Sequence, residues 1–277
     1  MLTLILALSI SAAVADPPSP AAIALQASLD AAISSGAASF ALPAGSTFFN
    51  SASFNISGAQ RISIGGSNST LVFAPGFGVN VTGASGTMLH TFSIDYSPLP
   101  YVYGTVTAAS SHSLQVQLDP ASLTFAQLHE QYPPHDIYPP GTVFRAGQLV
   151  APVCNWGSQV PATATGGLNY SIDCRGSGIE PGDVFVAATR VGITLSLSRC
   201  AAVLVQDVSI LSASYMAVTE FQGDGGNVYR RVRIAAPSPS RPLGSNADGF
   251  HSSGARAGPR LEGVEIRGLL DGACSSA

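Results

Sequence analysis

The chain has no lysine, one tryptophan and few charged residues among its 277 amino acids. All twelve basic residues are arginines, and the formal net charge is −4. A protein that binds nucleic acid needs a concentrated basic surface to neutralise phosphates. We therefore expect no nucleic-acid partner. The length suits either one large β domain or two ordinary domains, and it leaves the oligomeric state open.

Cysteine is also scarce. The four cysteines show neither a C-x-x-C pair nor the Cys/His spacing of a metal site: Cys154, Cys174, Cys200 and Cys274. We therefore predict no metal and no cofactor. Four thiols allow three pairings, of which Cys154 with Cys174 is the most local. Cys200 and Cys274 could form a second disulfide, or they could be free buried thiols.

The first fifteen residues form an apolar run that ends in Ala13-Val14-Ala15. This run is too short to span a bilayer, which takes about 20 residues, and it ends as a cleavage site does. We predict a signal peptide at 1–15, with a buried hydrophobic segment as the alternative, and no membrane span. Secretion to the outside, the cell wall or the surface also fits four N-x-[ST] glycosylation motifs, at Asn55, Asn68, Asn80 and Asn169.

The region 16–94 begins with a helix signal and continues with short β-rich runs. Ser19-Pro20 has the form of an N-cap followed by proline at the first helical position. Leu25, Leu29 and Ile33 then recur every four residues, which predicts one short amphipathic helix. Glycine, serine and asparagine separate the later runs, as between strands.

The region 95–190 has a different pattern. Its runs "YVYGTVTA" and "HSLQVQLD" alternate apolar and polar residues, and "YPPHDIYPPG" separates them from further β-rich runs. Such alternation predicts antiparallel strands with one wet face. We expect an inserted β module here.

The region 191–277 contains a repeat. Its three copies are "VQDVSI" at 205–210, "YRRVRI" at 229–234 and "LEGVEI" at 261–266. A period in the low twenties made of strands and turns predicts a solenoid, specifically a parallel β-helix with coils about 4.8 Å apart. Stacking the repeats puts Asp207 beside Arg231 and Arg233 beside Glu265 on the outer face.

Two Asp-Gly pairs follow the repeats, at Asp248 and Asp271, and their alignment sets the two aspartates 23 residues, or one coil, apart. Two neighbouring carboxylates cannot both ionise freely, so one becomes an acid while the other stays a base. Hydrolysis of a glycosidic bond needs these two roles. Asp-Gly is also a favoured turn pair, so a turn role for Asp248 stays open.

The segments "SNADGFHSSG" (245–254), "GPRLEGVEIRG" and "LDGA" resemble the right-handed parallel β-helix enzymes of the pectin-lyase-like superfamily, especially polygalacturonases and exo-acting α-1,3-galactosidases. The resemblance implies an all-β solenoid with a short N-terminal capping helix and an inserted antiparallel module. It implies that Asp248 and Asp271 are catalytic. His251 is then a candidate for binding a sugar hydroxyl or an exposed coil residue, and Asn246 a substrate contact or a turn residue.

The chain departs from the family at two places. Where the family has a second aspartate, this chain has Gly272, and it ends before the coils that carry the histidine and basic motifs of polygalacturonases. We expect a C-terminally truncated member. Glu220 is a further candidate for the acidic cleft.

Two functions remain in view, with a carbohydrate as the partner in both. The first is a secreted glycoside hydrolase that acts on galactosyl or galacturonyl glycans through paired carboxylates. The second is a non-catalytic extracellular β-helix that binds glycans or serves as a structural protein of the cell wall or surface. A polysaccharide lyase is a third possibility, but no basic proton acceptor or calcium-binding carboxylate cluster accompanies the motifs.

Overall fold

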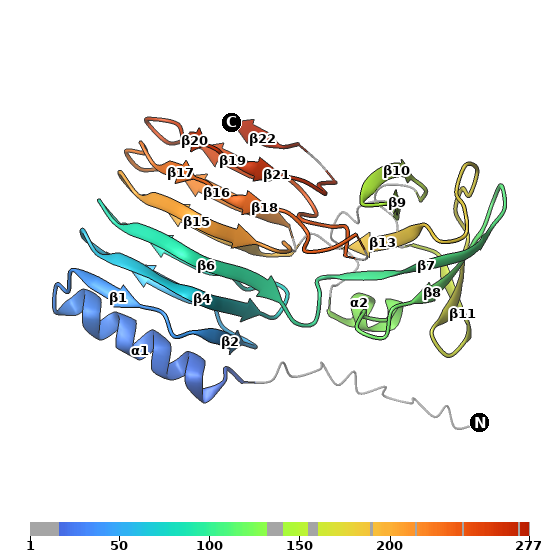
Figure 1. The fold of residues 1–277 in the computed structure, drawn as a ribbon, viewed down its shortest axis with the longest axis horizontal. Helices are drawn as coiled ribbons and strands as arrows, with labels where there is room; N and C mark the ends of the chain where they lie inside the picture. The colour runs from blue at the N-terminus through green and yellow to red at the C-terminus, as the bar shows by residue number, and fades with distance from the viewer. Residues whose placement is uncertain are drawn as a thin grey trace, which may run out of the picture.

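A computed structural model describes residues 17–131, 141–154, 160–188, 191–213, 215–239, 241–270 and 272–276. The predicted signal peptide (1–15) and Asp271 lie outside these residues. The described residues are mainly β. They form two parallel sheets, one antiparallel sheet and two helices. Figure 1 shows the parallel strands stacked on the left and the antiparallel sheet on the right.

Helix α1 (Pro20–Ser34) forms where the sequence predicts it. The Ser19 side chain accepts a hydrogen bond from the backbone N–H of Ala22 (3.1 Å), and Leu25 and Leu29 are buried. The helix lies against the first strands, at the bottom of the stack in Figure 1. It thereby covers the N-terminal end of the hydrophobic core.

The first parallel sheet pairs strands that are far apart in the sequence, and every pairing in it is parallel. Its strands are β1 (Ser39–Ala41), β2 (Gly45–Phe49), β4 (Ser63–Phe73), β6 (Met88–Tyr96), β15 (Leu204–Ile210), β17 (Val228–Arg230), β18 (Arg233–Ile234), β20 (Arg260–Glu262) and β21 (Glu265–Ile266).

The second parallel sheet alternates with the first along the chain. Its strands are β3 (Phe54–Ser57), β5 (Val79–Thr82), β14 (Ile193–Ser198), β16 (Met216–Phe221), β19 (Phe250–Ser253) and β22 (Cys274–Ser276). From β14 to β22 the chain enters the two sheets in turn. We call one strand of each sheet, taken in succession, a rung.

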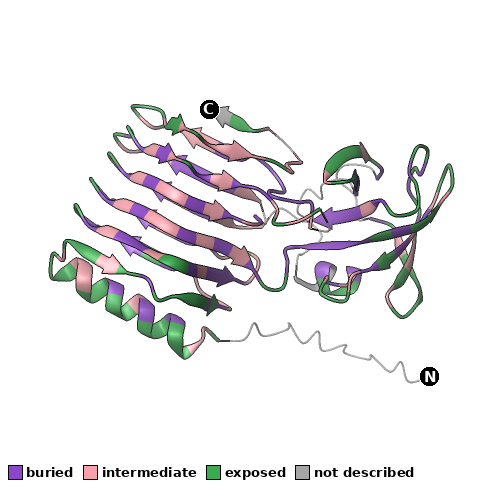
Figure 2. Cartoon of the chain, in the orientation of Figure 1, coloured by how far each residue is buried: buried purple, intermediate pink, exposed green. Residues whose placement is uncertain are grey.

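The two parallel sheets share one hydrophobic core. Because strand side chains alternate between faces, each strand of a sheet turns part of its residues towards the core. Val205 and Val208 come from the first sheet, and Leu195, Val218 and Phe250 come from the second. Burying a side chain of this size stabilises the fold by about 1.5–3 kcal/mol. Figure 2 shows burial along the middle strands and its decrease at β20 and β21.

The predicted repeat is confirmed in the first sheet. Val205 pairs with Tyr229 and Tyr229 with Leu261, while Ile234 pairs with both Ile210 and Ile266. The outer side chains follow the same register.

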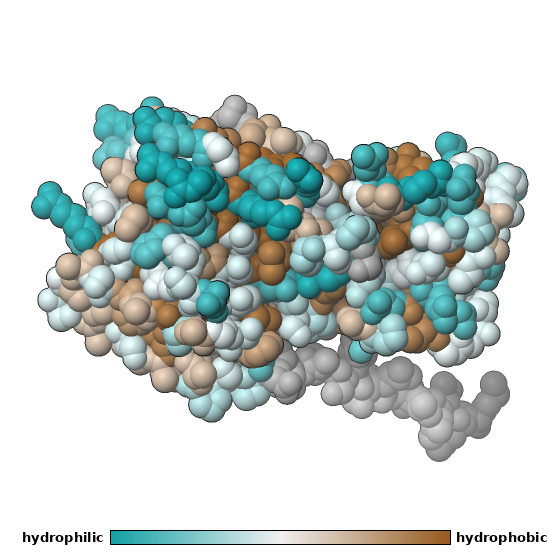
Figure 3. Space-filling model, in the orientation of Figure 1, coloured by the Kyte–Doolittle hydropathy of each residue, from teal (hydrophilic) through white to brown (hydrophobic). Residues whose placement is uncertain are grey.

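The ion pairs expected from that register are also present. Arg231 donates two hydrogen bonds to Asp207 (2.6 Å each), and Arg233 lies 3.3 Å from Glu265. They belong to the hydrophilic surface that Figure 3 shows over β15, β17 and β20. Exposed pairs of this kind contribute little stability, so their value here is as a marker of register.

The antiparallel sheet has the order β10-β9-β13-β7-β8-β12-β11. Its strands are β7 (Tyr101–Ala109), β8 (Leu114–Leu118), β9 (Thr142–Arg145), β10 (Gln148–Pro152), β11 (Ala162–Gly166), β12 (Asn169–Ile172) and β13 (Val184–Ala188). Helix α2 (Phe125–Gln131) follows β8 and packs on β7. A disulfide joins Cys154 to Cys174, and Cys200 and Cys274 are free thiols, the first buried and the second exposed.

The antiparallel sheet contacts the parallel stack through one of its faces. Tyr101, Tyr103 and Val186 form a cluster with Leu243, which precedes the predicted site loop. The opposite face holds a separate core that includes Val102 and Leu114. Neither described helix is long and apolar enough to span a membrane.

Candidate functional site

The segment 245–249 precedes β19 and is bonded to the preceding rung. The Ser245 hydroxyl donates to the Tyr215 carbonyl (2.8 Å), and the Asn246 backbone N–H donates to Ala213 (3.3 Å). The Asp248 carbonyl accepts from the Ala217 backbone N–H (3.0 Å). These bonds set the orientation of the segment, and they leave Asn246 fully buried. The role of Asn246 stays a prediction.

Asp248 and His251 form a contact on the outer face of the second sheet. His251 Nδ1 lies 3.2 Å from Asp248 Oδ2, and their side chains are 21% and 12% exposed. Phe250 points into the core, so the next residue of the strand points outward. The ring of His251 also lies beside Phe221, with a centroid distance of 6.3 Å. Two of the predicted site residues are thus brought together.

The outer row of this sheet is polar around His251. Thr219 pairs with His251 in the register, and Ser196 pairs with Thr219. Thr219 is fully buried, and its hydroxyl has no hydrogen-bond partner in the described structure. A buried hydroxyl without a hydrogen-bond partner is uncommon in folded proteins.

The predicted 23-residue alignment of the two Asp-Gly pairs is wrong by one residue. Strand β19 pairs with β22 at a spacing of 24, with Phe250 opposite Cys274, and the Gly249 N–H donates to the Gly272 carbonyl (3.1 Å). A Cβ atom placed on Gly272 would lie 3.2 Å from Asp248 Oδ1. A slip by one residue would exchange the inner and outer faces of the strand. Gly272 therefore lies beside the Asp248 side chain.

Glu220 lies on the inner face of the sheet rather than in an outer acidic cleft. It is 2% exposed, and in β16 it follows Thr219, which lies in the outer row. Its Oε1 accepts hydrogen bonds from the Asn227 amide (2.8 Å) and the Tyr229 hydroxyl (3.0 Å). Its Oε2 accepts one from the Ser252 hydroxyl (3.3 Å). Three donors to one buried carboxylate indicate a structural network.

Burial affects the titratable neighbours of Glu220. It raises the pKa of the Tyr229 hydroxyl well above its ordinary value, and the charge and hydrogen bond of Glu220 act in the same direction. Burial likewise raises the pKa of the Cys200 thiol. Both groups are therefore protonated near neutral pH. Alternation in "MAVTEF" does not assign Glu220 to one face, because the adjacent residues Ala217 and Val218 both belong to the core.

A cavity of about 260 Å³ lies over the last rungs, next to Glu220 and His251. Phe250, Ser252, Pro259, Leu261 and Cys274 complete its lining. In the part of the chain that is described, no three His, Cys, Asp or Glu side chains gather as metal ligands would.

The four glycosylation motifs lie at the surface to different degrees. Asn55, Asn68 and Asn169 are exposed, and Asn80 is half-buried. Asn55 and Asn80 are register partners in the second sheet, and Asn80 Nδ2 donates to Asn55 Oδ1 (3.2 Å). Glycans attached at Asn55 and Asn80 would therefore occupy the same part of the surface.

No family model matches the chain, and no curated protein matches it. Among solved structures, the tailspike protein gp49 from Pseudomonas phage LKA1 is similar at 13% sequence identity and a TM-score of 0.25. The similarity covers 91% of this chain and 48% of the tailspike chain, so this chain spans about half of that protein's length. A likeness of this size carries no conclusion about function.

Proposed function

We propose that the two parallel sheets close into a right-handed parallel β-helix of the pectin-lyase-like kind, and that the protein hydrolyses glycosidic bonds in galactosyl or galacturonyl glycans. The β-helix is supported by the alternation of the two sheets, their common core and the helix at its end. In this proposal the antiparallel region 95–190 is inserted between the coils of 16–94 and those of 191–277.

The observation that carries the hydrolytic proposal is the contact of Asp248 with His251. The segment 245–249 holds the Asp248 carboxylate on an outer face, and His251 orients it through Nδ1. In hydrolysis, a carboxylic acid gives its proton to the leaving glycosidic oxygen. A carboxylate takes a proton from the water whose oxygen adds to the anomeric carbon. Asp248 supplies one of these roles, and the family resemblance assigns the other to Asp271.

Binding without turnover is the second candidate, and one observation favours it. Gly272 occupies the position beside Asp248, where a side chain would place a second carboxylate. A site that lacks one of the family's carboxylates retains hydrogen bonds for sugar hydroxyls but loses one acid–base group.

Secretion is part of the proposal. It rests on the apolar N-terminal run, on the glycosylation motifs at the surface, and on the disulfide between Cys154 and Cys174. Disulfides persist mainly in oxidising compartments.

The test is the release of reducing sugar from α-1,3-galactosyl oligosaccharides and polygalacturonate by wild-type protein and by Asp248→Asn. We expect the substitution to reduce the rate at least ~100-fold, as for the loss of a general acid or base. Asp224→Asn is the matched control, because Asp224 is an exposed partner of Arg256. Equal rates for wild type and Asp248→Asn would refute catalysis by Asp248. Saturable binding with no release by the wild type would establish the second candidate.

A further inference from the structure

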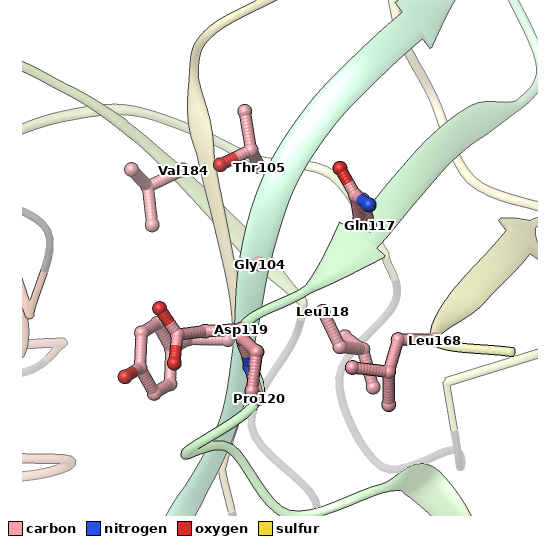
Figure 4. A pocket seen from close by; sticks show the side chains of 9 residues that line it. Gly104, Thr105, Gln117, Leu118, Asp119, Pro120, Leu168 and Val184 are labelled. Atoms are coloured by element: carbon pink, nitrogen blue, oxygen red, sulfur yellow. The ribbon is translucent and has the colours of Figure 1, made fainter.

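A hollow of about 310 Å³ lies on the antiparallel sheet. It is formed by strands β7, β8 and β13, by the turn after β8, and by Leu168 before β12. In Figure 4 the labelled side chains surround Gly104, which carries no side chain of its own. This volume lies within the range of natural small-molecule sites, at its lower end.

The lining of the hollow combines apolar walls with uncharged and acidic polar groups. The apolar residues are Leu118, Pro120, Leu168 and Val184. The polar residues are Tyr103, Thr105, Gln117 and Asp119. Thr105 and Gln117 are exposed, and Asp119 is half-buried. No basic residue is among the nine that line it.

Asp119 is held in place by its neighbours. Its Oδ1 accepts a hydrogen bond from the backbone N–H of Ala121 (2.8 Å), and its own backbone N–H donates to the Tyr103 carbonyl (3.1 Å). Burial raises the pKa of Tyr103 to about 12, and the hydrogen bond and charge of Asp119 add to that rise. The Tyr103 hydroxyl is therefore protonated at neutral pH. This arrangement orients an acceptor before any ligand arrives.

We propose that this hollow is a binding site for a neutral sugar unit, separate from the site at Asp248. A sugar hydroxyl donates to Asp119, while the Gln117 amide and Thr105 hydroxyl can each donate and accept. The apolar walls suit the C–H face of a pyranose ring, as in small-molecule sites with a few placed polar groups.

The charge of the lining selects among sugars. A uronate or a phosphorylated sugar would bring a negative charge next to Asp119 with no lining cation to pair with it. The site therefore discriminates against acidic sugars. Because Tyr103 packs in one cluster with Leu243, the sheet that carries the hollow contacts the segment that leads to Asp248.

The experiment is calorimetric titration with lactose, maltose and galacturonate, carried out in the Asp248→Asn background. That background keeps hydrolysis from consuming the probe, so failure of the proposed hydrolase activity does not affect the result. We expect at least one neutral disaccharide to bind with saturation. Gln117→Ala and Asp119→Asn should each weaken its binding at least ~10-fold, equivalent to about 1.4 kcal/mol. Galacturonate should not bind at the hollow.

Gln115→Ala is the matched control. Gln115 lies on the same strand and face, donates to the Ser171 hydroxyl (3.0 Å), and is not part of the lining. Binding by this variant should equal that of its parent. Absence of saturable binding by both neutral sugars, or equal affinities for the Gln117→Ala and Gln115→Ala proteins, would overturn the proposal. Melting temperatures and circular dichroism of all variants distinguish lost binding from lost folding.

Discussion

Asp248 has two neighbours of opposite character: the imidazole of His251, 3.2 Å from Oδ2, and the bare Cα of Gly272, whose missing Cβ would lie 3.2 Å from Oδ1. One carboxylate oxygen thus lies beside a polar ring, and the other lies beside a glycine. This asymmetry leads to the first prediction.

Introducing a carboxylate at position 272 should increase hydrolysis. In Gly272→Asp, two like charges share the site, so the pKa of one carboxyl rises and an acid and a base can coexist. We expect reducing-sugar release to rise at least ~10-fold over wild type. Gly272→Ala brings a similar crowding without charge. If the alanine and aspartate variants are equally slow, the missing carboxylate does not limit activity.

Removing the Glu220 carboxylate should destabilise the protein strongly. In Glu220→Ala the buried donors of Asn227, Tyr229 and Ser252 lose their acceptor. Leaving buried polar groups unpaired costs about 1–3 kcal/mol each, although such costs do not simply add. We expect a loss of about 3–5 kcal/mol in urea unfolding.

Two further variants test this prediction. Glu220→Gln should lose less, because its amide keeps one oxygen acceptor. Glu180→Ala removes an exposed glutamate side chain and should change stability by under about 0.5 kcal/mol. A Glu220→Ala protein as stable as Glu180→Ala would show that the network is not structural.

Three buried tyrosines should make the fold sensitive to alkaline pH. Burial is the largest cause of the raised pKa of Tyr101, Tyr103 and Tyr229. A folded-state pKa above the unfolded value near 10 adds stability that is fully present below pH ~10. That stability is lost as the pH rises through the folded-state values, of which Tyr103 has about 12.

The measurement is tyrosinate absorbance during alkaline titration, followed together with circular dichroism. We expect these three of the eight tyrosines to ionise only as the protein unfolds. Tyr229→Phe should retain more of its stability above pH ~10 than wild type does. Ionisation of all tyrosines before any loss of circular dichroism would contradict the prediction.

Asn55 and Asn80 should not both carry a glycan in one molecule. They are adjacent register partners, and the Nδ2 atom of Asn80 that a glycan would modify donates to Asn55. We expect secreted protein from a eukaryotic host to be modified at Asn68, at Asn169 and at one of this pair. Cleavage after acidic residues leaves 55–80 on a single peptide that also contains Asn68, so its mass should report two glycans and not three.

The control for this prediction is Asn80→Gln, which should raise occupancy at Asn55. A peptide that carries glycans at both Asn55 and Asn80 would contradict the prediction, and a protein with no glycan at any of the four motifs would count against secretion.

The sequence sufficed for features whose signals are local or periodic. Ser19-Pro20 and the leucines predicted α1, and the three apolar repeats predicted the register of the first sheet. The alternation in "HSLQVQLD" predicted a strand with one solvated face. That face carries Gln117, and Asp119 follows the strand. The alternation did not indicate the hollow, because its walls at Leu168 and Val184 come from distant segments.

Residue types, their spacing and their alternation thus predicted α1, the strands of the repeat and which residues of the repeats face the core. Only the tertiary structure decided what lies beside Asp248 and on which face Glu220 sits. The physical reason is that parallel strands pair through backbone hydrogen bonds between distant segments, and their side chains alternate with a period of two. A shift of one residue, invisible in the Asp-Gly motifs, places Gly272 beside Asp248.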